Sequence, residues 1–163
     1  MRAFWFIIFA AIALFLGCAK PAPPLASRSV VATIKTPTFS VSQSGFIDAF
    51  PNDEYRLQIY AAGHGALELR VGEKICKGAF CMSAAEFNRR YLSANYPPNF
   101  LRDILGRRTI AGLKNSVVAS GAGGWIQTAT LEGKYDVRYE NSGDFQRVRD
   151  SVNRVLIVIV GAN

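Results

Sequence analysis

Cysteine and histidine are the residue types here that most readily bind metals or act as nucleophiles, and the chain has three cysteines and one histidine. Four residues separate Cys76 from Cys81, whereas two residues separate the cysteines of thioredoxin-type redox motifs. Zinc would need two further ligands, and the chain offers only His64. Lys77-Gly78 favours a turn between the two cysteines. The pair therefore predicts a small structural disulfide, and we expect neither a metal nor a cofactor.

The third cysteine ends an N-terminal apolar segment. After a short basic start, residues 3–16 form an uncharged apolar run, followed by Gly17 and Cys18. The run is shorter than the roughly 20 apolar residues that span a membrane, which favours a cleaved signal peptide. The stretch Leu14–Cys18 is similar to a bacterial lipobox, in which the cysteine is acylated and the chain is cut just before it. We expect a signal peptide over residues 1–17 and lipidation at Cys18, with an ordinary secretory signal as the alternative.

Length and composition describe the remaining chain. The 163 residues are half hydrophobic and carry a net charge of +7, which fits one domain with a core and excludes a disordered chain. In an exported protein this charge points to anionic lipid surfaces, and we expect no nucleic-acid partner. Export also favours a disulfide, because disulfides persist in oxidising compartments. The Pro- and Ala-rich stretch after Cys18 predicts a flexible tether over residues 18–36, which leaves residues 37–163 as the folded domain.

The sequence lacks a catalytic constellation. It contains no GxSxG nucleophile motif, no HExxH zinc motif and no phosphate-binding glycine loop between a strand and a helix. His64 lies between two glycines, where a single histidine is more often an exposed turn residue than a catalytic base. The carboxylates occupy scattered surface-type positions, at Asp53, Glu54, Glu68 and Glu86. We therefore expect that the protein is not an enzyme.

Alternating hydrophobicity predicts strands through most of the domain. Apolar and polar residues alternate over residues 55–71 on both sides of a glycine-rich turn, which predicts a hairpin. The apolar residues between 38 and 50 change parity at Gly45, which predicts a bulge or turn there. A flexible connector is expected over residues 120–124, followed by a hairpin around Glu132-Gly133.

The chain end and the middle of the domain have different patterns. Residues 145–160 fit either a helix or two strands, and their β-branched end favours strands. Ser83 and Glu86 form a capping box that predicts a helix over residues 84–93. A second helix should begin at Pro97-Pro98 and end at Gly106. The predicted class is α+β, with an antiparallel β-rich body and two short helices.

Three segments in this order carry the pattern of a known family. Asp53–Leu69 contains YRL, two nearby glycines and LEL, Phe100–Gly106 ends in an L..IL.G-like pattern, and Trp125 opens a later set of strands. Over about residues 38–160 the chain resembles the family of the outer-membrane lipoprotein receptor LolB and its periplasmic relative LolA. The resemblance implies an incomplete, unclosed β-barrel capped by the two helices.

The resemblance also implies an apolar concavity that binds acyl chains by burying their methylene groups. Its expected lining is the inward face of the strands: Phe39, Val41, Phe46, Leu57, Ile59, Leu67, Leu69, Trp125, Tyr135 and Val137. Gly63, His64 and Gly65 correspond to a protruding loop, although the family has an apolar residue where this chain has His64. The same apolar positions also fit the packed core of a small domain, and both interpretations remain open.

These features predict a lipoprotein held by its lipid at the periplasmic face of the outer membrane. We expect a carrier or receptor for acylated lipoproteins or lipid, with acylated lipoproteins or a periplasmic carrier as partners. The alternative is a structural or assembly lipoprotein that docks onto a protein partner and binds no lipid.

Overall fold

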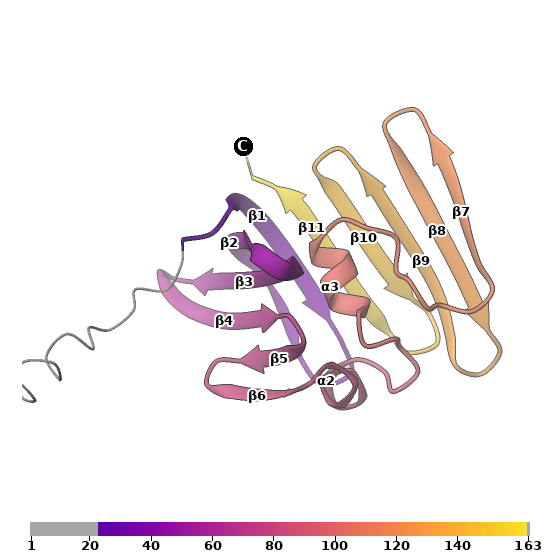
Figure 1. The fold of residues 1–163 in the computed structure, drawn as a ribbon, viewed down its shortest axis with the longest axis horizontal. Helices are drawn as coiled ribbons and strands as arrows, with labels where there is room; N and C mark the ends of the chain where they lie inside the picture. The colour runs from indigo at the N-terminus through magenta and orange to yellow at the C-terminus, as the bar shows by residue number, and fades with distance from the viewer. Residues whose placement is uncertain (1–22, 163) are drawn as a thin grey trace, which may run out of the picture.

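Residues 23–162 are described by a computed structural model (Figure 1). The predicted signal peptide over residues 1–17 and the predicted lipidation site Cys18 lie outside the described residues. No helix within residues 23–162 is long and apolar enough to cross a bilayer.

One eleven-stranded sheet carries the fold, in the order β6-β5-β4-β3-β2-β1-β11-β10-β9-β8-β7. Every neighbouring pair is antiparallel. The strands are β1 (Ala26–Lys35), β2 (Ser40–Phe50), β3 (Glu54–Ala61), β4 (His64–Val71), β5 (Lys74–Lys77), β6 (Phe80–Ser83), β7 (Ser116–Gly121), β8 (Gly124–Leu131), β9 (Tyr135–Ser142), β10 (Phe145–Asp150) and β11 (Val155–Gly161). The edges β6 and β7 do not pair, so the sheet is curved but unclosed, as predicted.

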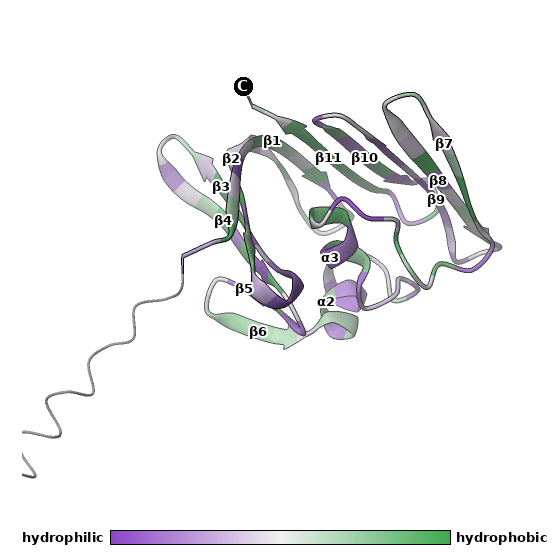
Figure 2. Cartoon of the chain, turned by 45° about the horizontal axis from the view of Figure 1, so that its top comes forward, coloured by the Kyte–Doolittle hydropathy of each residue, from purple (hydrophilic) through white to green (hydrophobic). Residues whose placement is uncertain are grey.

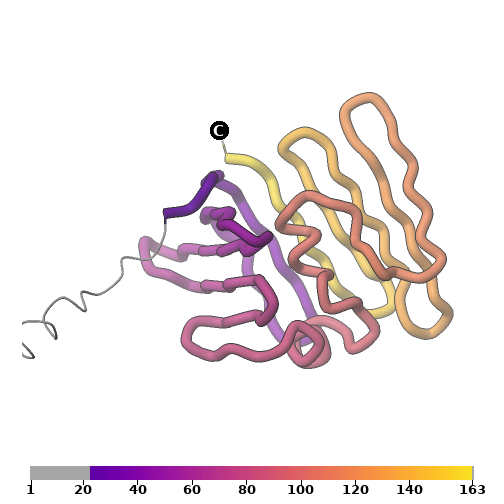
Figure 3. The backbone as a smooth tube through the Cα atoms, viewed as in Figure 1, coloured from indigo at the N-terminus to yellow at the C-terminus, as the bar shows by residue number. Residues whose placement is uncertain are grey.

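The two halves of the sheet meet at its centre. The chain runs outward from β1 to the β6 edge through successive hairpins, crosses over the sheet, and returns from the β7 edge to β11 (Figure 3). Because β11 pairs with β1, the first and last strands join the two halves. Both strands are rich in hydrophobic residues (Figure 2).

Two short helices lie in the crossing segment, on the concave side of the sheet (Figure 1). In α2 (Ala84–Tyr91), the Ser83 side chain accepts a hydrogen bond from the Glu86 backbone N–H at 3.2 Å, as its capping motif predicts. The helix α3 (Phe100–Leu105) ends at Gly106, also as predicted. A short 3-10 turn, η1 (Pro51–Asp53), links β2 to β3. Both predicted helices are present, although α3 begins at Phe100 and not at Pro97-Pro98.

Alternation along the strands separates a buried inner face from a wetter outer face. In β9, for example, Tyr135, Val137 and Tyr139 are buried, while Asp136 and Arg138 are exposed. Side chains from the helices complete the core, and Phe87, Phe100 and Ile104 are at most 1% exposed. Burying each such side chain stabilises the fold by roughly 1.5–3 kcal/mol.

The structure corrects the predicted tether over residues 18–36. Residues 26–35 form β1, which pairs with both β2 and β11, so this part of the tether belongs to the folded body. The predicted end of the tether was too late in the chain, because the Pro- and Ala-rich residues before β1 indicated an extended segment. The alternation of Val30, Ala32 and Ile34, all buried, is the signal of this strand.

The predicted bulge at Gly45 is also wrong. The strand β2 is continuous, and Gly45 and Ile47 both lie on its buried side. A Cβ at Gly45 would lie 2.0 Å from the backbone oxygen of Gln58 in β3, so this inward position accepts only glycine. Because glycine has no side chain, the hydrophobic pattern does not reveal that position 45 faces inward. The outward-facing Phe46 was therefore wrongly predicted as a core residue.

The connector predicted over residues 120–124 is a tight hairpin turn. Residues 116–121 form the edge strand β7, and β8 begins at Gly124. Residues 145–160 form β10 and β11, so the strand alternative is the correct one.

Candidate functional site

The predicted lining residues mostly gather on the concave face. Five of them are buried there by the helices and neighbouring strands: Leu57, Ile59, Leu69, Tyr135 and Val137. Four more are partly buried and pack against this core: Phe39, Val41, Leu67 and Trp125. Phe46 was wrongly predicted as lining, because it lies on the outer face, 44% exposed, with its ring 6.2 Å from that of Tyr60.

The concave space is filled in this structure. The α2 side chain Phe87 and the α3 side chains Phe100 and Ile104 are buried within the same hydrophobic cluster as the lining residues. Tyr96, between the helices, stacks on Phe100 with ring centroids 4.0 Å apart. In this conformation the predicted lining therefore acts as a packed core.

Polar side chains of the sheet hold the segment that contains α3. We call the inward side chains of Arg28, Gln127, Tyr139, Asn141 and Gln146 the polar seam, because each hydrogen-bonds the crossing segment. Gln146 is central: its amide nitrogen donates to the Ile104 carbonyl at 2.8 Å and to the Tyr139 hydroxyl at 2.7 Å. Arg28 donates to the Leu105 carbonyl at 3.2 Å and to the Gln146 amide oxygen at 3.1 Å. These bonds satisfy the carbonyls at the end of α3.

The polar seam continues beyond α3. The Gln127 side chain accepts from the Ile110 N–H at 2.7 Å and donates to the Ile110 carbonyl at 3.0 Å. The Asn141 amide donates to the Arg107 carbonyl at 3.1 Å. The crossing segment is thus fixed by directional contacts at several points along its path, where a purely apolar interface would leave its backbone polar groups unpaired.

Electrostatics within the polar seam disfavour proton-transfer chemistry. Burial lowers the pKa of Arg28 from its ordinary value, and the nearby Arg107 cation lowers it further. Because the ordinary pKa of arginine is very high, Arg28 keeps its charge. Burial raises the pKa of Tyr139 to about 12, so its hydroxyl stays neutral. Arg28 has no carboxylate within ion-pair distance among residues 23–162. The polar seam therefore has a structural role here, in which its side chains hold backbone carbonyls of the crossing segment.

An aromatic cluster borders the core beside α2. The Lys77 ammonium lies 5.5 Å from the ring centroid of Phe39 and 4.9 Å from that of Tyr91. Tyr91 also packs on Phe87, with ring centroids 4.8 Å apart. These contacts connect α2 to the β1–β2 turn and to the β5–β6 hairpin.

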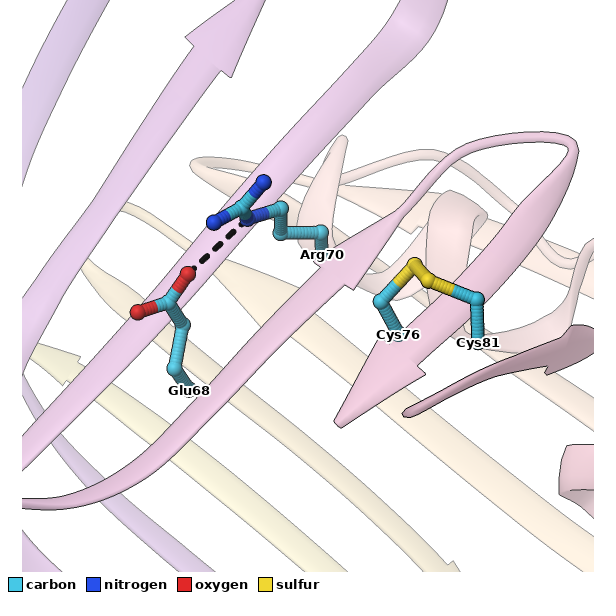
Figure 4. Close-up of a disulfide and its surroundings, with 4 residues drawn as sticks. All are labelled: Glu68, Arg70, Cys76 and Cys81. Atoms are coloured by element: carbon cyan, nitrogen blue, oxygen red, sulfur yellow. Dashed lines mark hydrogen bonds and ion pairs between the residues drawn. A yellow bond between two sulfur atoms is a disulfide. The ribbon is translucent and has the colours of Figure 1, made fainter. Parts of the chain in front are cut away.

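The predicted disulfide is present. Cys76 and Cys81 face each other across β5 and β6, with their sulfur atoms bonded at 2.04 Å (Figure 4). On the neighbouring strand β4, Arg70 donates to Glu68 at 2.9 Å. Within residues 23–162, no group of three potential metal ligands from His, Cys, Asp and Glu gathers.

The predicted protruding loop is a tight turn. Ala61 pairs with His64, so only Ala62 and Gly63 lie between the strands, both at positive φ. His64 and Gly65 already belong to β4, and both are exposed.

No protein-family model matches this sequence, and no curated protein matches it at a significant level. The site therefore has to be interpreted from its own geometry. The polar seam was not predicted, although polar residues at inward strand positions, such as Gln127 between Trp125 and Ala129, are a visible signal.

Proposed function

We propose that this protein is an outer-membrane lipoprotein that carries or receives acylated lipoproteins or lipid at the periplasmic face. The observation that carries the proposal is an unclosed antiparallel sheet whose concave face is apolar and is covered by two short helices. The resemblance of residues 53–69 and 100–106 to the LolB and LolA family supports the same function. Lipidation at Cys18 would hold the body at the membrane.

The filled concavity sets a condition on this function. Phe87, Phe100 and Ile104 occupy the space that acyl chains would need. Cargo would therefore enter only when α3 and the segment after it move off the sheet. The hydrogen bonds of the polar seam suit such a movement, because water can replace them when the segment leaves.

A single substitution in the polar seam tests the carrier proposal. Gln146→Leu removes the donor to the Ile104 carbonyl and the Tyr139 hydroxyl while keeping a similar volume. It should weaken the closed state by roughly 1–3 kcal/mol, which raises the population with α3 displaced by about tenfold or more. We expect residues 23–163 with this change to bind a fluorescent triacylated lipopeptide about tenfold more tightly than the unmodified chain.

A destabilising change elsewhere is the matched control. Asp48→Ala removes a buried acceptor of Arg56 and Ser27 on the outer side of β2, away from the polar seam. It should lower stability without increasing lipopeptide binding. Equal binding by both variants, or no binding by any of them, would contradict a carrier with a movable cover.

The second candidate is a structural or assembly lipoprotein that binds no lipid. The packed interior favours it, because a solid core needs no movement to be stable. This candidate predicts that Gln146→Leu only lowers the free energy of unfolding. The lipopeptide titration therefore separates the two functions.

A further inference from the structure

A groove of about 620 Å³ lies on the outer face of the sheet, beside the turn between β10 and β11. We call it the basic groove, because its rim carries Lys35, Arg147, Arg149 and Arg154. Leu156 and Val158 of β11 form its floor. The cations point away from the core, because the adjacent residues Ile34 and Val148 are the buried ones.

Strand register brings these charges together. Leu156 is the pairing partner of both Lys35 in β1 and Arg149 in β10, so two cations flank one leucine. Arg149 also lies directly opposite Arg138 in β9. Like charges at directly opposed positions destabilise a sheet. The stability of the fold therefore does not explain why these cations lie together.

The nearby carboxylate neutralises only part of this charge. Glu140 pairs with Arg138 at 2.7 Å and with Arg147 at 3.2 Å. The hydrogen bond from Arg138, followed by the Arg147 charge, holds the pKa of Glu140 below its ordinary value despite partial burial. Among residues 23–162, Lys35, Arg149 and Arg154 form no ion pair. Three cations of the groove therefore remain available to an external anion.

The turn that carries Arg154 is held rigidly. The Asp150 carboxylate accepts the backbone N–H groups of Val152 and Asn153 at 2.9 and 3.2 Å. It also accepts a hydrogen bond from the Tyr96 hydroxyl at 2.5 Å, and Asp150 is 1% exposed. The oxygens of this carboxylate are therefore used by hydrogen bonds within the fold. Arg154 itself has φ of 54°. A fixed turn places the Arg154 cation without the cost of ordering a flexible loop.

We propose that the basic groove binds the phosphate groups of anionic phospholipids at a membrane surface. Arginine matches phosphate oxygens well, and clustered basic residues are attracted to anionic leaflets. Val152 at the tip of the turn is 49% exposed, which adds an apolar contact of the kind that inserts between lipid headgroups. The groove lies on the face opposite to α2 and α3, so lipid contact there leaves the helices free to move. The proposal does not depend on the carrier function.

Vesicle binding tests this proposal. The test uses residues 23–163, which include every strand and helix that the structure describes. We expect this chain to sediment with phosphatidylglycerol–phosphatidylcholine vesicles and not with pure phosphatidylcholine vesicles. The variant Lys35→Gln, Arg149→Gln, Arg154→Gln should bind about 100-fold more weakly, and Arg149→Gln alone about fivefold more weakly.

A charge-matched variant controls for the net charge of the chain. Lys74→Gln, Arg90→Gln, Lys114→Gln removes three exposed cations from other parts of the surface and should change binding less than about threefold. An equal loss in both triple variants would overturn the proposal in favour of diffuse attraction. Absence of binding to the phosphatidylglycerol vesicles would overturn it in favour of another anionic partner, such as an acidic protein.

Discussion

At the residue scale, Asp150 connects the core to the surface. Its carboxylate receives hydrogen bonds from Tyr96, Asn153, Val152 and the backbone N–H of Asp136. Burial opposes its charge, but the side-chain and backbone hydrogen bonds that it accepts together outweigh burial and hold the pKa of Asp150 below its ordinary value. Burial first, and then the hydrogen bond to Asp150, raise the pKa of Tyr96. This network requires the ionised carboxylate.

Removal of this carboxylate should destabilise the protein in a pH-dependent way. We expect Asp150→Ala to lower the free energy of unfolding by about 3 kcal/mol at pH 7, because several donors lose a charged acceptor. A lowered folded-state pKa contributes stability above the unfolded pKa, and this contribution is lost as pH falls below about 4. Urea unfolding at pH 7 and pH 3 should show a smaller difference between variant and unmodified chain at pH 3. A difference independent of pH would contradict the role of the ionised form.

At the element scale, local signals predicted local elements. The helices were predicted because Ser83 and Gly106 mark their ends within one or two residues. Five of the lining residues were predicted because each of them stands between polar or less buried neighbours in β3, β4 or β9. The polar seam escaped prediction because its contacts join distant parts of the chain: Arg28 and Leu105 are 77 residues apart. Periodicity indicates which face a residue occupies and does not indicate its partner across the core.

The β5–β6 hairpin gives a test at the same scale. Cys76→Ser, Cys81→Ser should lower the free energy of unfolding by about 2 kcal/mol, because the disulfide closes only a short loop in the unfolded chain. The sheet register should persist, since the hairpin also pairs through Lys74–Ser83 and Ile75–Met82. Urea unfolding of the double variant, beside the unmodified chain under reducing conditions, measures this loss. Global unfolding of either sample without urea would show that the disulfide contributes more to the stability of the fold than we expect.

At the scale of the whole molecule, the two faces of the sheet have different chemistry. The concave face is apolar, crossed by a polar seam and covered by α2 and α3. The outer face carries the basic groove at the end of β10. We propose that a body with this asymmetry contacts anionic lipid on one side and takes up cargo with its covered apolar face on the other. Such a carrier requires the covered face to open to an acyl chain.

Photo-crosslinking can show whether the covered face opens to an acyl chain. A triacylated lipopeptide with a diazirine near the end of one acyl chain would be irradiated with residues 23–163, and the labelled peptides would be identified by mass spectrometry. We expect labels on inner-face residues such as Leu57, Ile59 and Val137, which are at most 2% exposed in the closed structure. Labels confined to exposed outer residues such as Phe46 and Tyr60, or no labels, would contradict this expectation.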